Sequence, residues 1–251
     1  MIHREELNEL TVLRLEHGKV SALDLELLAT FRECLVELRN SSHRGVVLTG
    51  TGSSFSAGVD LRRVLEGGRD YLQKFLPALD AALLELFEFP RPVIAAVNGH
   101  AIAGGCILAC ACDYRIMAEG NGRIGATELL VGVPFPALPL EILRACVSPQ
   151  YFQRAVYTGQ TYTPREAVSA GLIDEISPLD SLMNCAIERA RQMAAISSRA
   201  FAITKAKMRR DALERARRSA TETDAAVAEI WSAGETLQTI AAYLERTIRK
   251  K

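Results

Sequence analysis

The order of hydrophobic and polar positions along the chain predicts strands that alternate with helices. Alternation over residues 12–20 predicts a short pair of strands that turns at His17 and Gly18. Apolar residues at helical spacing predict a helix over residues 23–38. The continuous apolar run "GVVLTG" at residues 45–50 predicts a buried strand bounded by glycines.

The same pattern continues after the loop "TGSSFSAGVD". A mostly helical region is predicted over residues 61–89, ended by Pro90 and Pro92. "PVIAAVNG" predicts a second buried strand, followed by a helix from about Gly104 and a third strand near "YRIMAE". Because strands and helices alternate, the predicted fold class is α/β.

The C-terminal part of the chain has a different character. From Pro178 onward the spacing predicts helix after helix. A composition shift near Ile196 predicts a boundary between a core of residues 1–195 and a helical region of residues 196–251. Residues 199–218 hold eight Lys or Arg and two acids, a pattern typical of a solvated helix face and also compatible with an RNA-binding surface.

Composition narrows the possible functions. A chain of 251 residues that is 49% hydrophobic can bury the core of one sizeable domain plus an appendage. Thirty basic and thirty acidic residues cancel, and aromatic residues do not alternate with the basic ones in that segment, so no nucleic-acid partner is expected. The charged N-terminus does not resemble a signal peptide and no run is long enough to span a bilayer, so we expect a cytoplasmic protein without a membrane partner.

The cysteines predict neither a disulfide scaffold nor a metal site. Six cysteines are too few for a disulfide scaffold in a chain of this length. Cys106, Cys110 and Cys112 lie close together in the sequence, but no histidine or second cysteine pair stands at zinc spacing. We therefore expect small buried thiols and no bound metal.

Three segments could carry chemistry. In "SSFSAGVDL" and "VNGHAIAGGCILACACD", glycines follow buried strands and precede helices, where backbone N–H groups can stay unpaired. Two such N–H groups converging on one oxygen would form an oxyanion hole, whereas tight turns and close packing explain the same glycines without function. In "IGATELLVGVPFP", Glu128 stands alone among small and apolar residues, as a proton-transferring carboxylate or as a solvated residue in a first helical turn.

Together these segments resemble the crotonase superfamily, also called the enoyl-CoA hydratase/isomerase family, over essentially the whole chain. "FSAGVDL", "AAVNGHAIAGGCILACACDYRI" and "IGATELLVGV" are similar to the family's two oxyanion segments and its glutamate loop, in the family's order. "YTGQTYTPREAVSAGLIDEI" resembles the stretch that leads to the family's C-terminal helices. The resemblance implies a crotonase-type ββα spiral core with a C-terminal helical trimerisation region.

The resemblance also implies roles for individual residues. The N–H groups of Val59 and Gly104 would hold the thioester oxygen of an acyl-CoA, and Glu128 would be the acid and base. "VSALD" matches the family's Asn-Ala-Leu stretch, with Ser21 where the family has Asn. Further acyl-CoA contacts are expected at Ala22, Ala57, Gly58, Asp60, Leu61, Ile102, Gly105, Ile107 and Thr127.

One departure from the family decides which reaction we favour. Hydratases of this family carry a second glutamate three residues after the oxyanion glycine, and here that position is Ile107. Hydration needs water held between two carboxylates, whereas moving a double bond from C3 to C2 needs one base on one face of the substrate. We therefore favour a 3-enoyl-CoA isomerase over a hydratase, a thioester hydrolase or a weakly catalytic CoA-thioester binder.

The resemblance implies partners as well. No cofactor is expected beyond the coenzyme A of the substrate, and a homotrimer or a dimer of trimers is expected. The C-terminal helices could bring Lys205 or Lys207 near the CoA phosphates. Loops at residues 65–76 and 133–138 are expected to shape the acyl pocket, with Gly67 in a mobile cover over it. "GVPFPALP" stands where hydratases have a Gly-Gly-Thr-Gln-type sequence.

Overall fold

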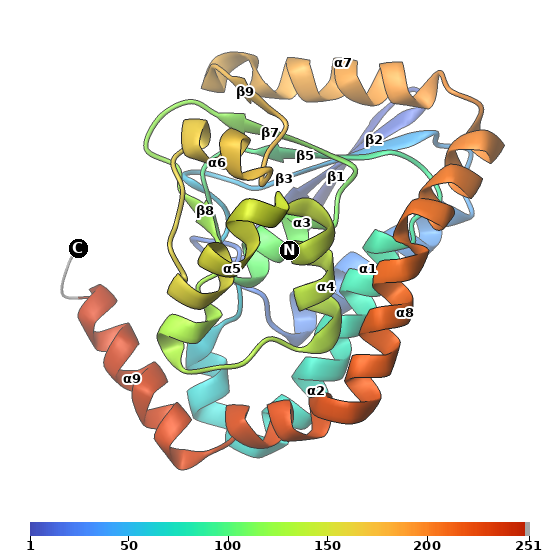
Figure 1. The fold of residues 1–251 in the computed structure, drawn as a ribbon. Helices are drawn as coiled ribbons and strands as arrows, with labels where there is room; N and C mark the ends of the chain where they lie inside the picture. Colours follow the sequence, from blue (N-terminus) through green and yellow to red (C-terminus); the bar gives the residue numbers. More distant parts are fainter. Residues whose placement is uncertain (249–251) are drawn as a thin grey trace.

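The centre of the protein is a mixed sheet seen edge-on in Figure 1. The structure is a computed structural model that describes residues 1–248. Six strands follow the order β1-β2-β3-β5-β7-β9, with β1 antiparallel to β2 and every later pair parallel. They are β1 (Ile2–Leu7), β2 (Leu10–Leu15), β3 (Gly45–Thr49), β5 (Val93–Val97), β7 (Tyr114–Ala118) and β9 (Glu175–Ser177). The α/β prediction is confirmed, and β3, β5 and β7 lie in the three predicted strand segments.

The first hairpin lies earlier than the sequence predicts. Strands β1 and β2 pair from Ile2 opposite Leu15 to Leu7 opposite Leu10, so the turn is at Asn8 and Glu9. Asn8 takes a φ of 57°, a left-handed conformation that asparagine tolerates better than most residues. The predicted turn at residues 17–18 instead lies in the loop that leads from β2 to the first helix.

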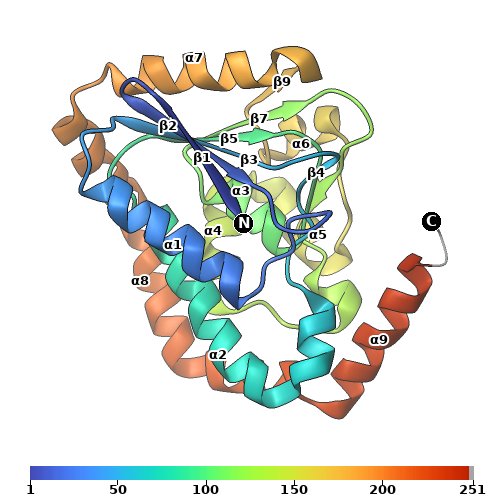
Figure 2. The same cartoon turned by 180° about the vertical axis from the view of Figure 1, so that it is seen from behind.

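Helices cover both faces of the large sheet (Figures 1 and 2). On one face α7 (Leu182–Ala194) packs Ala186 and Ala190 against the apolar side chains of the strands. On the other face lie α1 (Leu25–Arg39) and α2 (Leu61–Phe87), which contribute to the main apolar core. Strands β3 and β5 are therefore buried on both sides, which explains their continuous apolar sequences.

The predicted pocket loop at residues 65–76 is helical in the structure. It forms part of α2, which departs from helical geometry at Gly68 (φ 49°, ψ −137°). The amphipathic spacing of Val64, Leu72 and Phe75 buries one face of this helix, and burial explains why the segment is not a loop. The glycine pair at residues 67–68 therefore lies at a bend within α2 and does not form a separate loop over the acyl pocket.

A second, smaller sheet positions the candidate site. It contains β4 (Ser54–Ser56), β6 (His100–Ile102) and β8 (Ile124–Gly125), paired in that order and all parallel. Strand β4 leads into α2, β6 into α3 (Gly104–Cys110), and β8 into the short 3-10 helix η1 (Glu128–Val131). The three segments with predicted chemistry therefore follow three neighbouring strands of one sheet.

The rest of the described chain is helical. It comprises α4 (Ala137–Cys146), α5 (Pro149–Thr158), α6 (Pro164–Ala170), η2 (Leu179–Ser181), α8 (Ser198–Trp231) and α9 (Gly234–Ile248). The predicted helical tail is thus confirmed over its described residues, and α8 packs against α4. The division at residues 195 and 196 stays a prediction. Within residues 1–248, no helix combines the length and the apolarity that crossing a bilayer requires.

A buried ion cluster attaches α8 to the core. Asp113 accepts hydrogen bonds from Lys205 Nζ at 2.7 Å and from an Arg209 guanidinium nitrogen at 2.8 Å. Lys205 is 7% exposed, and burial lowers its pKa to about 8. The expectation that Lys205 contacts CoA phosphates is therefore wrong, because its ammonium group is buried against Asp113. Lys207 is exposed.

Replacing Asp113 with alanine is expected to destabilise the protein by about 3 to 5 kcal/mol, because two buried cations lose their common partner. The free energy of unfolding, measured by urea titration, checks this. Asp211→Ala is the matched control, since Asp211 and its partner Arg210 are both exposed. Such surface pairs contribute about 0 to 1 kcal/mol. An equal loss of unfolding free energy in the two variants would contradict the role of Asp113 as the partner of both buried cations.

Candidate active site

Two backbone N–H groups lie close together where α2 and α3 begin. A Cβ built on Gly104 would stand 3.7 Å from the nitrogen of Val59, so the two segments are in contact. Within residues 1–248, neither the N–H of Val59 nor that of Gly104 donates a hydrogen bond to another group. The neighbours are paired, since Leu23 N–H donates to Gly58 O and Asp60 N–H donates to Leu23 O. Two free donors next to each other can hold one oxygen.

Gly58 is required for this arrangement. Its φ is +79°, and an added Cβ would lie 2.5 Å from Ile102 O and 2.9 Å from Gly104 N. A side chain at this position would force apart the two segments that carry the donors.

Ala103 adds backbone strain beside the donors. It precedes Gly104 with a φ of 49° and a ψ of −121°, a conformation that alanine rarely adopts. Backbone strain of this kind is concentrated at functional sites. It fixes the direction of the peptide that ends in the Gly104 N–H.

Glu128 is a buried carboxyl group with an unsatisfied oxygen. It opens η1 and is 7% exposed, and its Oε2 has no hydrogen-bond partner among the described residues. Desolvation by burial raises the pKa of Glu128 from its ordinary value of 4.5 to about 8. A carboxyl group with a pKa near neutrality can both accept and return a proton at physiological pH. The solvated alternative for this residue does not fit its burial.

A cavity of about 50 Å³ joins the glutamate to the donor segments. Six of the predicted site residues line it: Ala57, Val59, Leu61, Ile102, Thr127 and Glu128. Gly58 and Gly104 lie against Val59 through the contacts described above. Glu128 carries the only carboxyl group among the described lining residues.

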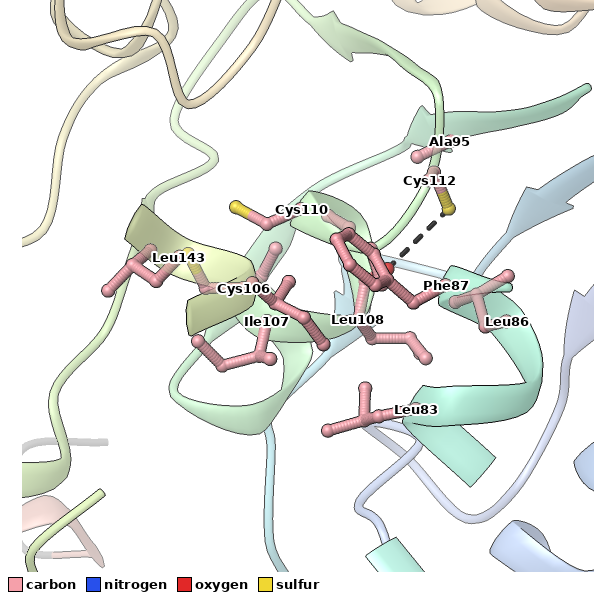
Figure 3. Packing of buried hydrophobic residues seen from close by; sticks show 14 of the residues in the cluster. Leu83, Leu86, Phe87, Ala95, Cys106, Ile107, Leu108, Cys110, Cys112 and Leu143 are labelled. Carbon is pink, nitrogen blue, oxygen red and sulfur yellow. Dashed lines mark hydrogen bonds between the residues drawn. The ribbon is translucent and has the colours of Figure 1, made fainter. Parts of the chain in front are cut away.

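Besides Gly58, four predicted contact residues lie outside the lining of this cavity. Ile107 is fully buried in the main apolar core, where Figure 3 shows it with Leu108 and Leu143. Gly105 allows α3 to pack on β4, because an added Cβ would meet Ser56 O at 2.2 Å. The positions of Ile107 and Gly105 therefore indicate roles in packing the core.

The other two lie beside the Val59 segment. The Asp60 side chain caps α2 by accepting from the N–H groups of Arg62 and Arg63. Ala22 is half-buried and precedes Leu23, which pairs with Val59.

Residues near the C-terminus complete the cavity, and sequence reasoning missed them. Trp231 at the end of α8 and Tyr243 in α9 line it together with Val131 and Val133. Val133 does fall in the predicted pocket loop at residues 133–138. Among the other three residues, the sequence distinguishes only Trp231, because it is the only tryptophan of the chain.

The thiols have no partner in a disulfide. All six cysteines are free, and Cys106, Cys110 and Cys112 are buried in the apolar core (Figure 3). Over residues 1–248, no three His, Cys, Asp or Glu side chains are grouped so that they could hold a metal ion.

Comparison with known proteins identifies relatives of this chain. The family model described as enoyl-CoA hydratase/isomerase matches residues 5–250. Human enoyl-CoA delta isomerase 1, mitochondrial, is 32% identical over 96% of this chain and 80% of its own length. A putative enoyl-CoA hydratase of Thermus thermophilus is 35% identical over 64% of each chain. The crystal structure of human mitochondrial delta3-delta2-enoyl-CoA isomerase superimposes with a TM-score of 0.93 at 29% identity, covering 100% of this chain and 99% of that one.

Proposed function

The chain belongs to the enoyl-CoA hydratase/isomerase family, and from that premise we propose that it isomerises a 3-enoyl-CoA to a 2-enoyl-CoA with Glu128 as the proton shuttle. The observation that supports this proposal most strongly is the single buried carboxyl group beside two unpaired N–H donors. Relatives with isomerase names and relatives with hydratase names both match the chain, so the reaction is argued from the site itself.

The proposed reaction uses one proton and one oxyanion. Ionised Glu128 removes a proton from C2 of the substrate, and the electron pair of that C–H bond moves into a dienolate whose negative charge is on the thioester oxygen. The N–H groups of Val59 and Gly104 donate to that oxygen, and they bind it more strongly in the transition state than in the substrate. Glu128 then returns the proton at C4, which leaves the double bond between C2 and C3.

Water addition fits the site less well. Hydration needs a water molecule activated by one carboxylate while a second acid delivers a proton to the neighbouring carbon. The lining of this cavity offers Glu128 and no second carboxyl group among its described residues. Ile107, at the position where the family's hydratases carry their other glutamate, is packed in the core.

Two substrates separate the candidate functions. The purified protein is incubated with a 3-enoyl-CoA and, separately, with the 2-enoyl-CoA of the same chain length, and the products are resolved by chromatography. We expect 2-enoyl-CoA from the first substrate and little 3-hydroxyacyl-CoA from the second. Rapid hydration of the 2-enoyl substrate would overturn the proposal. Binding of both thioesters without turnover would instead indicate a CoA-thioester binder.

The pH dependence of kcat/KM is expected to report the pKa of Glu128. Because the base must be ionised in the free enzyme, kcat/KM should fall about tenfold per pH unit below the pKa of about 8 and level off above it. Initial rates with a 3-enoyl-CoA between pH 5.5 and 9.5, a range of about four units around that value, check this. A nearly flat profile over this range, as the ordinary glutamate value of 4.5 would give, would show that the carboxyl is not desolvated in the working enzyme.

A further inference from the structure

The cavity beside Glu128 has room for only a short acyl chain. Its volume is about 50 Å³. An engineered apolar cavity of about 150 Å³ holds one benzene molecule, so this cavity is small for an acyl chain. With the carbonyl carbon placed at the Val59 and Gly104 donors, that space leaves room for only a short acyl chain.

The wall of the cavity is part of a packed apolar cluster. We name it the Trp231 cluster; its buried members are Val64, Leu72, Val131, Val133, Val227, Trp231 and Ile240. These residues come from α2, η1 and its following loop, α8 and α9, so four parts of the chain meet there. Val131, Val133 and Trp231 face the cavity as well as the cluster.

Trp231 is held in one position. It is 2% exposed, and its indole Nε1 donates to Pro134 O at 2.9 Å. Moving the ring would break this bond and open contacts between helices. Such close-packed interiors resist small displacements, so a longer chain cannot simply push the wall aside.

The lining also restricts the chemistry of the chain. Apart from Glu128, the described lining residues carry no charged group. The last four of them along the chain are Val131, Val133, Trp231 and Tyr243. A charged or strongly polar tail would be desolvated here without a counter-charge.

From these observations we propose that Trp231 sets the acyl-length limit and that the substrates are short-chain, uncharged 3-enoyl-CoA thioesters. This inference rests on the proposed isomerase function for its kinetic test, but not for its binding test.

The kinetic test compares six-carbon and ten-carbon 3-enoyl-CoA. The wild-type kcat/KM should favour the shorter chain by about 100-fold, since even one methylene changes the fit of an apolar pocket by 10-fold or more. Trp231→Ala should raise the ratio of long-chain to short-chain kcat/KM by about tenfold or more. Trp231→Phe, which keeps an aromatic ring, should keep the wild-type preference.

Ile240→Ala is the matched control. Ile240 is fully buried in the Trp231 cluster but does not line the cavity. It should lower stability while leaving the chain-length ratio within about twofold to threefold. An equal change of the ratio in Ile240→Ala and Trp231→Ala would assign the effect to loosening of the cluster, and would overturn the role of Trp231 as the limit.

The binding test uses saturated hexanoyl-CoA and decanoyl-CoA, which cannot be isomerised, and measures Kd by calorimetry. Wild-type protein should bind hexanoyl-CoA more tightly, and Trp231→Ala should lose this preference. If no 3-enoyl-CoA is turned over, the proposed function fails while this test still decides the length limit. If wild-type protein isomerises or binds the ten-carbon thioester as well as the six-carbon one, the length limit is wrong, whether or not the variants fold.

Discussion

Replacing Glu128 with glutamine is expected to lower kcat/KM for a 3-enoyl-CoA by about 10³- to 10⁴-fold, the upper part of the range for general acid–base catalysis. The large effect follows because the same carboxyl group removes the proton at C2 and returns it at C4. Glutamine has nearly the same shape but has no carboxylate to accept the proton. Initial rates measured at saturating and limiting substrate check this.

The same substitution should stabilise the fold at neutral pH. The folded-state pKa of Glu128, about 8, is raised above its ordinary value of 4.5. The unfolded chain therefore ionises first as the pH rises, and wild-type protein loses stability between these two values. Glutamine does not titrate, so the variant should gain about 4 kcal/mol over wild type at pH 8, and the gain should vanish below about pH 4.5.

A control separates this effect from a general charge effect. Glu119 is exposed and does not line the cavity, so Glu119→Gln should leave both kcat/KM and stability within experimental error of wild type. A Glu128→Gln variant that keeps most of the activity would exclude Glu128 as the proton shuttle. A variant that is inactive and also unfolded would contradict the pKa argument.

Replacing Gly58 with alanine is expected to lower kcat/KM by at least about 10²- to 10³-fold, the loss typical of one missing oxyanion donor. The new Cβ would lie 2.5 Å from Ile102 O and 2.9 Å from Gly104 N, so the backbone around both donors must move. The loss should be in kcat more than in KM, because the donors act mainly on charge that develops in the transition state. Steady-state kinetics with a 3-enoyl-CoA measure both parameters.

Gly52→Ala is the control variant for the effect of backbone strain alone. Gly52 has a φ of +60°, and no atom would lie within 4 Å of an added Cβ. Alanine in the left-handed region costs about 1 to 2 kcal/mol at either glycine. Gly52→Ala should therefore lose only this strain energy, whereas Gly58→Ala should lose more stability because its Cβ also meets backbone atoms, and Gly58→Ala alone should lose kcat. Full activity in a folded Gly58→Ala variant would show that the donors at Val59 and Gly104 are not used.

Local sequence patterns were informative where one segment determines its own structure. The buried strands at β3 and β5 are read from continuous apolar runs, because burial on both faces removes the alternation of polar positions. The start of α3 at Gly104 is likewise indicated by glycines after a strand. Glu128 is identified as unusual by its apolar neighbours in the sequence, and the structure shows it buried.

These local patterns do not predict contacts between residues that are distant in the sequence. Trp231 lies about a hundred positions after Glu128 and reaches the cavity only because α8 runs across the molecule (Figure 1). Lys205 is at a position that reads as a solvated basic face, yet it is buried because Asp113, distant in sequence, neutralises it. The first hairpin was misplaced because its outer strand β1 is largely exposed and polar, with little apolar alternation to mark it.

Transfer of deuterium from C2 to C4 within one turnover tests the central claim most directly. A 3-enoyl-CoA labelled with deuterium at C2 is mixed with excess enzyme in ordinary water, and the product is analysed by NMR. Because Glu128 is buried and shuttles one proton between the two carbons, we predict 2-enoyl-CoA that carries part of the label at C4. Product with only protium at C4, or with a hydroxyl group at C3, would contradict a single-glutamate isomerase.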